Sequence, residues 1–300
     1  MNNQTNLTFS IITPTYNRAD FLERIWKNLN PQSIYISEWI VIDDGSNDKT
    51  YEVISKLKNI SSIDIIYQYS SNRGMTNAIN IGLKYVNANY FFKLDSDDYL
   101  TESSLKTIAN YINRVRESKI KENVNAYSFL SVNPSGELIN KFSDLLKSGK
   151  YIDDKIVTAD YVSARLLNWI SGDLLDIFES YPLLDHFRYP VFSDERHSPS
   201  AYISYFNSDY NKGFVAYILE AVLIKDYQKD GVSFQRLFNK KNTSSENYKT
   251  YLTANIRLLK ITEDKLKPFF ISIKEVLKLF MLLLFKYIFK FIKLIFNHSS

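Results

Sequence analysis

The chain has 300 residues, of which 45% are hydrophobic and 15% aromatic, and it contains no cysteine. This length and apolar content are typical of one large or two small globular domains and exclude a disordered protein. The lack of cysteine excludes a disulfide framework and a thiolate metal site. The formal net charge is +4, and residues 265–300 carry seven lysines against one acid, so the basic charge is concentrated at the C-terminal end.

The first part of the chain alternates between two kinds of apolar pattern. Continuous apolar runs predict buried strands at residues 9–14, 39–42, 63–67, 90–92 and 126–132, and apolar residues at helical spacing predict helices at 18–30, 51–57, 78–86 and 101–118. We expect Pro14 to end the first strand. Strands and helices that alternate at these spacings predict an α/β fold with a mostly parallel sheet flanked by helices.

Acidic residues follow two of these predicted strands. Asp43 and Asp44 come directly after the second strand, and Asp95, Asp97 and Asp98 come after the fourth. Parallel strands place their carboxyl ends at one edge of a sheet, so both clusters should line one crevice. Carboxylates crowded there repel one another unless a cation neutralises them, and such oxygen ligands suit Mg²⁺ or Mn²⁺. The simpler alternatives are a helix cap at the later cluster and an Asx turn at the earlier one.

Four sequence blocks, in this order, resemble the family 2 glycosyltransferases, which have the Rossmann-like GT-A fold that binds nucleotide sugars. They are Ile12-Thr13-Pro14-Thr15-Tyr16-Asn17-Arg18, then Val41-Ile42-Asp43-Asp44-Gly45-Ser46, then Asn72 and Gly74 with Ala78, Asn80 and Gly82, and finally Leu94-Asp95-Ser96-Asp97-Asp98. Any one of these blocks would be a weak signal, and their combination over about residues 8–100 makes the resemblance specific.

The resemblance implies a role for several of these residues. Pro14, Tyr16 and Asp44 would contact the nucleoside base, and Asn72, Gly74 and Asn80 would belong to the same nucleotide-sugar site. Asp97 would ligate a Mg²⁺ or Mn²⁺ ion that bridges the diphosphate, with Asp95 near the ribose and as a second metal ligand. This is chemically coherent, because a carboxylate accepts an N–H of the base and a divalent cation neutralises the departing nucleoside diphosphate.

One position departs from the family pattern. Many relatives carry an arginine that contacts the diphosphate between the alanine and the asparagine of the third block, and this chain has Ile79 there. Arg73 or Lys84 could replace it.

The second half of the chain resembles a subset of the same family more loosely. Residues 171–178, which contain a Gly-Asp pair, and residues 194–199 match two blocks of that subset, and Tyr227, Asp230 and Gly231 match a third. The match places Glu195 at the position of the catalytic carboxylate, with Asp194 where the subset has glycine and Ser200 where it has a second acid. An inverting transferase needs a base to deprotonate the acceptor hydroxyl. Asp194 and Asp173 are further catalytic candidates, and the alternative for Glu195 is a surface ion pair with Arg196 or Arg188.

We therefore expect a glycosyltransferase that moves a sugar from a nucleotide-sugar donor, a UDP-sugar in preference, to a hydroxyl of a glycan or lipid-linked acceptor. Transfer should invert the anomeric carbon and serve cell-surface polysaccharide synthesis. A nucleotidyltransferase is the first alternative, but it would need a glycine-rich phosphate loop after the first strand, which residues 14–17 do not form. The second alternative is a non-catalytic scaffold of the same fold, which the retention of Asp44, Asp95, Asp97 and Glu195 disfavours.

The expected domains are a GT-A domain at residues 1–235, a polar and helical connector at 236–268, and a basic amphipathic helix at 269–300. Lysines lie among aliphatic and aromatic residues in this helix, which favours an anionic membrane surface over nucleic acid. The longest uncharged run, residues 279–285, is far shorter than the roughly 20 residues that a membrane span needs. Residues 1–6 show no secretory signal. We expect a cytoplasmic protein bound peripherally to the inner face of the membrane, with homo-oligomerisation through the helix as the alternative.

Overall fold

The computed structural model describes residues 7–119, 124–142, 145–159, 164, 170–181, 183–189 and 214–228. All of them belong to the first of two compact units, residues 1–239. The connector and the basic helix predicted at 236–268 and 269–300 lie outside the described residues. Within the described ranges, no helix has the length and apolar character needed to cross a membrane.

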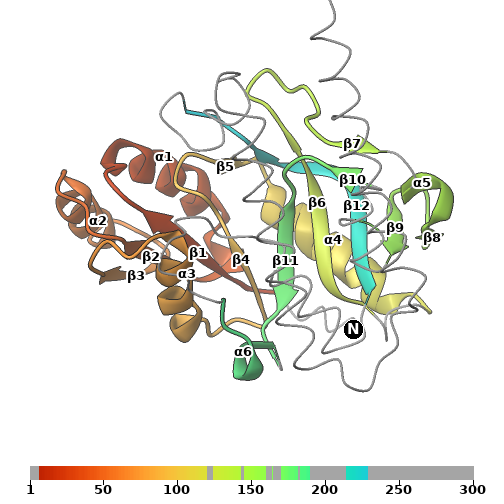
Figure 1. The fold of residues 1–300 in the computed structure, drawn as a ribbon, viewed down its shortest axis with the longest axis horizontal. Helices are drawn as coiled ribbons and strands as arrows, with labels where there is room; N and C mark the ends of the chain where they lie inside the picture. The colour runs from red at the N-terminus through yellow and green to blue at the C-terminus, as the bar shows by residue number, and fades with distance from the viewer. Residues whose placement is uncertain are drawn as a thin grey trace, which may run out of the picture. The chain divides into compact units, whose positions relative to one another are not determined.

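A ten-stranded sheet carries the fold (Figure 1), with the strand order β3-β2-β1-β4-β11-β6-β12-β9-β8 and with β5 paired to β12. The strands are β1 (Phe9–Thr15), β2 (Ile36–Asp43), β3 (Asp64–Tyr69), β4 (Tyr90–Lys93), β5 (Tyr99–Leu100), β6 (Val124–Val132), β8 (Lys150–Tyr151), β9 (Ile156–Ala159), β11 (Leu175–Glu179) and β12 (Phe214–Ile224), while β7 (Lys141–Phe142) and β10 (Ile170–Ser171) form a separate small sheet.

The direction of the strands decides where the site can form. The first four strands in the order, β3, β2, β1 and β4, are parallel, as the sequence predicted. Strand β11 is antiparallel to both of its neighbours, β4 and β6, and β12 is again parallel to β6. The carboxyl ends of β1, β2, β4, β6 and β12 therefore lie at one edge of the sheet, together with the start of β11. The expected fold class, a mixed and largely parallel sheet flanked by helices, is confirmed.

Helices cover both faces of the sheet. They are α1 (Ala19–Leu29), α2 (Thr50–Lys58), α3 (Met75–Gly82), α4 (Ser104–Glu117), α5 (Leu145–Ser148) and α6 (Leu183–His186), with 3₁₀ turns η1 (Asn30–Tyr35) and η2 (Leu83–Tyr85). Apolar side chains of α1, α2 and α4 share one core cluster with Phe9, Trp39 and Phe92. Helix α3 packs on the other face, because its Gly82 lies against Ile12 and Ile42 of β1 and β2. The alternation of side chains along β1 and β2 thus builds two apolar layers.

The first strand does not end at Pro14. In the structure β1 continues to Thr15, and Pro14 pairs in register with Ile42 of β2. The reason is that β4 pairs with β1 only as far as Ile12, so the last part of β1 has a neighbour on one side alone. A proline is tolerated at such an open edge, where its missing N–H has no partner to lose.

The close approach of α3 to the sheet depends on Gly82. A Cβ atom at this position would lie 2.7 Å from Cγ2 of Ile12, which is too close for an unshifted contact. We predict that Gly82→Ala lowers the free energy of unfolding by about 1–3 kcal/mol, the usual cost of overpacking, measured by urea denaturation.

A mutant cycle separates this contact from other effects. In an Ile12→Ala background the Gly82→Ala penalty should largely vanish, because Cγ2 is gone, whereas in an Ile12→Val background, which keeps Cγ2, it should persist. Equal penalties in all three backgrounds would show that the contact is not its cause.

Candidate functional site

A pocket with a volume of about 290 Å³ lies at the edge of the sheet where the strand ends meet. The ends of β1, β2, β4 and β12 supply most of its walls. Its lining residues are Pro14, Thr15, Tyr16, Arg18, Asp44, Met75, Asp95, Ser96, Asp97, Asp98, Lys225, Tyr227 and Gln228. The structure therefore brings five residues of the sequence blocks, Pro14, Tyr16, Asp44, Asp95 and Asp97, to one cavity, although they come from three separate segments of the chain.

Asp44 shapes the wall of this pocket. Its carboxylate accepts hydrogen bonds from the backbone N–H groups of Arg73, at 2.9 Å, and Gly74, at 2.8 Å. Gly74 has a positive φ of 91°, which glycine adopts readily, and α3 begins at the next residue. Gly45, next to Asp44, also has a positive φ, and a Cβ there would lie 2.9 Å from the backbone nitrogen of Asn72. Asn72 and Gly74 thus belong to the loop that Asp44 holds.

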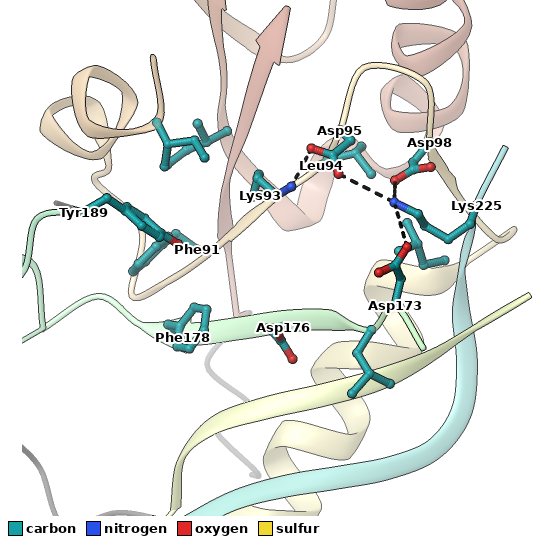
Figure 2. A pocket seen from close by; sticks show the side chains of 14 residues that line it. Phe91, Lys93, Leu94, Asp95, Asp98, Asp173, Asp176, Phe178, Tyr189 and Lys225 are labelled. Atoms are coloured by element: carbon teal, nitrogen blue, oxygen red, sulfur yellow. Dashed lines mark hydrogen bonds and ion pairs between the residues drawn. The ribbon is translucent and has the colours of Figure 1, made fainter. Parts of the chain in front are cut away.

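The acidic loop after β4 is neutralised by a lysine that the sequence analysis did not single out. Lys225 follows β12, and its ammonium lies 2.5 Å from Asp98, 3.6 Å from Asp95 and 3.7 Å from Asp173. Figure 2 shows the three carboxylates around it. Its side chain is 10% exposed and that of Asp98 is 3% exposed, so this ion pair is buried. Lys93 of β4 forms a second ion pair with Asp95, at 2.5 Å.

These contacts shift the pKa values of the acids in different directions. Burial raises the pKa of Asp95, but the ammonium groups of Lys93 and Lys225 outweigh it and hold that pKa at about 2. Burial also raises the pKa of the Asp97 carboxyl, and the charge of Asp95 raises it further. Burial raises the pKa of Asp98 to about 7 against the opposing effect of Lys225. The surrounding carboxylates hold the pKa of Lys225 well above its usual value despite burial.

Comparison with known proteins identifies the domain that carries this site. Residues 10–120 match the profile of Glycosyl transferase family 2. The chain carries a family 2 glycosyltransferase domain. The matched segment runs from the second residue of β1 through β4 and the acidic loop after it. It therefore includes every residue that lines the pocket except Lys225, Tyr227 and Gln228. Lys225 and its neighbours lie beyond it.

Curated relatives agree with this family. The chain is 29% identical over 108 residues to the poly(ribitol-phosphate) beta-N-acetylglucosaminyltransferase TarS of Staphylococcus aureus, a match that covers 35% of this chain and 19% of TarS. It is 27% identical over 260 residues to a GalNAc(5)-diNAcBac-PP-undecaprenol beta-1,3-glucosyltransferase of Campylobacter jejuni, covering 86% of this chain and 75% of the relative. The chain thus spans a small part of TarS and most of the Campylobacter protein.

Solved structures show the same fold. The crystal structure of S. aureus TarS 1–349 in complex with UDP-GlcNAc superposes with a TM-score of 0.56 at 19% identity, over 75% of this chain and 60% of that one. The mannosyltransferase PcManGT from Pyrobaculum calidifontis, in complex with GDP-Man and Mn²⁺, has a TM-score of 0.50 at 17% identity, over 78% and 61% of the two chains. At these identities the likeness concerns the fold.

Two segments brace the acidic loop of the family 2 domain from outside. Arg24 of α1 donates a hydrogen bond to the backbone carbonyl of Asp97, forms an ion pair with Asp226 at 2.5 Å and lies 4.7 Å from the ring centre of Tyr99. The backbone N–H of Asp226 in turn lies 3.4 Å from the Asp98 carboxylate. The loop is therefore held by a helix on one side and by the segment after β12 on the other.

Asn80 joins two separate segments of the fold. Its side-chain amide donates to the backbone carbonyl of Tyr189 at 2.8 Å and accepts from the backbone N–H of the same residue at 2.8 Å. This two-bond pairing fastens the segment after α6 to α3. Asn80 is not among the described residues that line the 290 Å³ pocket, and its contact with a nucleotide sugar stays a prediction.

The two predicted metal ligands, Asp97 and Asp95, have different surroundings, and their binding of a cation stays a prediction. Among the described residues, no three acidic or histidine side chains converge as a ready-made metal site, and no basic group lies within ion-pair distance of the Asp97 carboxylate. Asp95, the second predicted ligand, already faces two lysines. A half-buried carboxylate with a raised pKa gains from a cation, and Mg²⁺ commonly takes one or two protein carboxylates together with substrate phosphates and water.

Of the three predicted catalytic residues, Asp173 is the one that lies among the described residues, and it precedes β11. Its side chain is 49% exposed and accepts a hydrogen bond from the Tyr227 hydroxyl at 2.9 Å. Tyr227 lines the 290 Å³ pocket, so this carboxylate stands beside it. Glu195 and Asp194, with Asp230 and Gly231, lie outside the described residues.

We predict that the Lys225 cluster is required for stability. Lys225→Met removes the cation while leaving Asp98 buried, which should lower the free energy of unfolding by roughly 3–5 kcal/mol in urea denaturation at pH 7.5. The matched control is Lys155→Met, because Lys155 pairs with Glu220 at 3.6 Å with both side chains more than 40% exposed. That change should cost below about 1 kcal/mol.

A second substitution tests the cause. Adding Asp98→Asn to Lys225→Met removes the carboxyl group that is left buried without its cation, so part of the lost stability should return. If the two lysine variants lose the same stability, the buried cluster does not have the weight assigned to it here.

Proposed function

We propose that the chain transfers a sugar from a UDP-sugar to a hydroxyl of a glycan or lipid-linked acceptor, with inversion at the anomeric carbon, in the synthesis of a cell-surface polysaccharide. The observation that carries the proposal is the 290 Å³ pocket, in which Pro14, Tyr16, Asp44, Asp95 and Asp97 meet at the carboxyl edge of a parallel sheet. Ligands of open α/β folds bind at this edge. The family 2 domain at residues 10–120 supports the reaction class.

The proposed base-binding end of the pocket is formed by Tyr16 and Asp44. The Tyr16 side chain is 45% exposed although it lies at the mouth of a cavity, so its ring is available for a planar base. The Asp44 carboxylate, fixed by two backbone N–H groups, keeps further lone pairs that can accept the imide N–H of a uracil. The related fold of TarS, crystallised with UDP-GlcNAc, is consistent with a UDP-sugar.

The diphosphate end is proposed to lie at the acidic loop. Asp97 would hold a Mg²⁺ or Mn²⁺ ion there, with Asp95 as the second predicted ligand. When bound, the cation supplies positive charge against the departing nucleoside diphosphate. The protein contributes fixed charge of its own, because the Arg18 and Lys225 side chains line the same pocket. A preorganised cation that already faces the developing charge needs no reorganisation during the reaction.

The proton of the acceptor hydroxyl has to leave as the hydroxyl attacks the anomeric carbon, and we propose Glu195 as the base that takes it. Asp173 would stand on the acceptor side, where Tyr227 and Lys225 fix its carboxylate. Asp194 is the remaining candidate.

The proposed acceptor and place of action rest on the names of two relatives and on the basic C-terminal segment. TarS is named for poly(ribitol-phosphate), and the Campylobacter relative is named for GalNAc(5)-diNAcBac-PP-undecaprenol, and these names support a glycan or lipid-linked acceptor. The basic helix predicted at residues 269–300 would hold the enzyme at an anionic inner membrane face, close to such an acceptor.

We predict that Asp97→Ala abolishes nearly all transfer while the fold survives, because removing one of several like charges relieves repulsion. The measurement is release of UDP from a UDP-sugar panel at increasing Mn²⁺ and Mg²⁺, with Asp154→Ala, an exposed acid outside the pocket, as the control. Near-normal turnover of Asp97→Ala at saturating metal would remove Asp97 from the metal site, as would wild-type turnover that EDTA leaves unchanged.

Glu195→Gln keeps the shape of the side chain and removes its basicity. We predict that turnover falls by roughly 100-fold or more while the dissociation constant of the donor, measured by calorimetry, stays within about twofold. Asp173→Asn is assayed alongside it. If Glu195→Gln turns over normally and Asp173→Asn does not, the catalytic base is Asp173. Analysis of the product by NMR reports whether the anomeric configuration is inverted.

A further inference from the structure

A second cavity, with a volume of about 90 Å³, adjoins the proposed donor pocket. The two cavities share three lining residues, Asp95, Asp98 and Lys225. The smaller one extends from the acidic loop between α3 and the strands β4 and β11 (Figure 2). The two cavities therefore lie next to each other along the acidic loop and Lys225.

The small cavity has one aromatic and one charged end. Figure 2 shows Phe91, Phe178 and Tyr189 on one side, Asp176 beside Phe178, and the other lysine and aspartate groups on the far side. Phe91 and Phe178 are directly paired across β4 and β11, with their ring centres 5.8 Å apart. Ile79 of α3 adds an aliphatic side chain to this lining. These four side chains are buried, so the aromatic end is a formed apolar surface.

Hydrogen bonds, an ion pair and a ring contact hold the cavity walls in place. Two hydrogen bonds from Asn80 fasten Tyr189 to α3. The Tyr189 ring packs edge-on against Phe187, with the two ring centres 4.8 Å apart. At the polar end, Asp176 accepts a hydrogen bond from the Ser128 hydroxyl at 2.5 Å, and Lys93 is paired with Asp95. A ligand group entering here meets side chains that are oriented before it arrives, which lowers the entropic cost of binding.

Size restricts what can enter. A cavity of roughly 150 Å³ in another protein holds one benzene ring, so about 90 Å³ is too small for a pyranose ring. It is large enough for a substituent of a few heavy atoms. The sugar ring itself would remain in the donor pocket, and the small cavity would take a group that projects from it.

We propose that this cavity receives the acetamido group of an N-acetylated donor sugar. The inference rests on the proposed function. The acetamido N–H can donate to the Asp176 carboxylate, its carbonyl can accept from the Lys93 ammonium, and its methyl group can pack on Phe91 and Phe178. A hydroxyl group would leave the aromatic end without a contact, and a methyl group alone would leave the charged end without one. The acetamido group satisfies both ends of the cavity.

Matched pairs of donors test this. The full-length protein is titrated by calorimetry, in Mn²⁺, with UDP, with UDP-glucose and UDP-N-acetylglucosamine, and with UDP-galactose and UDP-N-acetylgalactosamine. Each pair differs only in the group at issue. We expect the N-acetylated member of at least one pair to bind about 10-fold more tightly or better, the usual range for a small group that fills a specific pocket.

Two variants fill the cavity. Ile79→Phe adds bulk from α3, and Leu174→Trp adds it from the half-exposed segment before β11, where folding is less sensitive to the change. Each should reduce the N-acetyl preference to about twofold or less, since the acetamido group no longer fits. Ile81→Phe is the matched control, because it makes the same exchange in α3 at a residue that lines neither cavity, and it should keep the preference.

The outcomes separate the two proposals. If UDP does not bind, the UDP-sugar donor is wrong and the acetamido inference fails with it. If UDP binds but neither N-acetylated donor is preferred, the donor proposal stands and the acetamido inference is overturned. The same holds if the preference survives in the folded cavity-filling variants.

Discussion

The buried ammonium group of Lys225 is the interaction on which the site depends. A lysine taken out of water is costly unless carboxylates surround it, and three carboxylates at one sheet edge repel one another unless a cation lies among them. Lys225 contacts Asp98, Asp95 and Asp173, which come from the loop after β4 and the segment before β11. The carboxylates offset the cost of burying the ammonium group, and the ammonium group offsets the repulsion among the carboxylates. The acidic loop and the end of β12, 127 residues apart in the chain, therefore stabilise one another.

This pairing changes how the acidic motif of the family 2 domain should be understood. Three acids in five residues suggest three metal ligands, but two of them, Asp95 and Asp98, already face lysines. The pKa of Asp95 is held at about 2, whereas that of Asp97 is raised by burial and by its acidic neighbour. Asp97 is thus the one acid of this loop that forms no ion pair among the described residues. A single protein carboxylate is a weak ligand by itself, so the proposed divalent cation would bind far better together with the diphosphate of the proposed donor.

The sequence sufficed to predict that the acids of the proposed donor site lie together, because the rule involved is local. Strands that alternate with helices are parallel, and acids directly after parallel strands share an edge, which is why Asp44, Asp95 and Asp97 meet in the pocket. Lys225 and Asn80 were beyond this rule, because their partners lie 127 and 109 positions away. The sequence does indicate that Lys225 lies at the end of a strand, because the eleven residues of β12 before it are almost wholly apolar. Its partner strand could not be read from periodicity.

The proposed acceptor side follows from one topological feature, the antiparallel strand β11 between β4 and β6. Since β11 runs against its neighbours, its beginning lies at the edge where they end. Asp173 is therefore placed at the site although it precedes a strand. A rule that considers only acids that follow parallel strands does not predict it. The same reversal aligns Phe178 with Phe91 and so builds the aromatic end of the small cavity. A parallel strand in this place would carry its first residues to the opposite edge, and both the carboxylate and the cavity would be lost from the donor pocket.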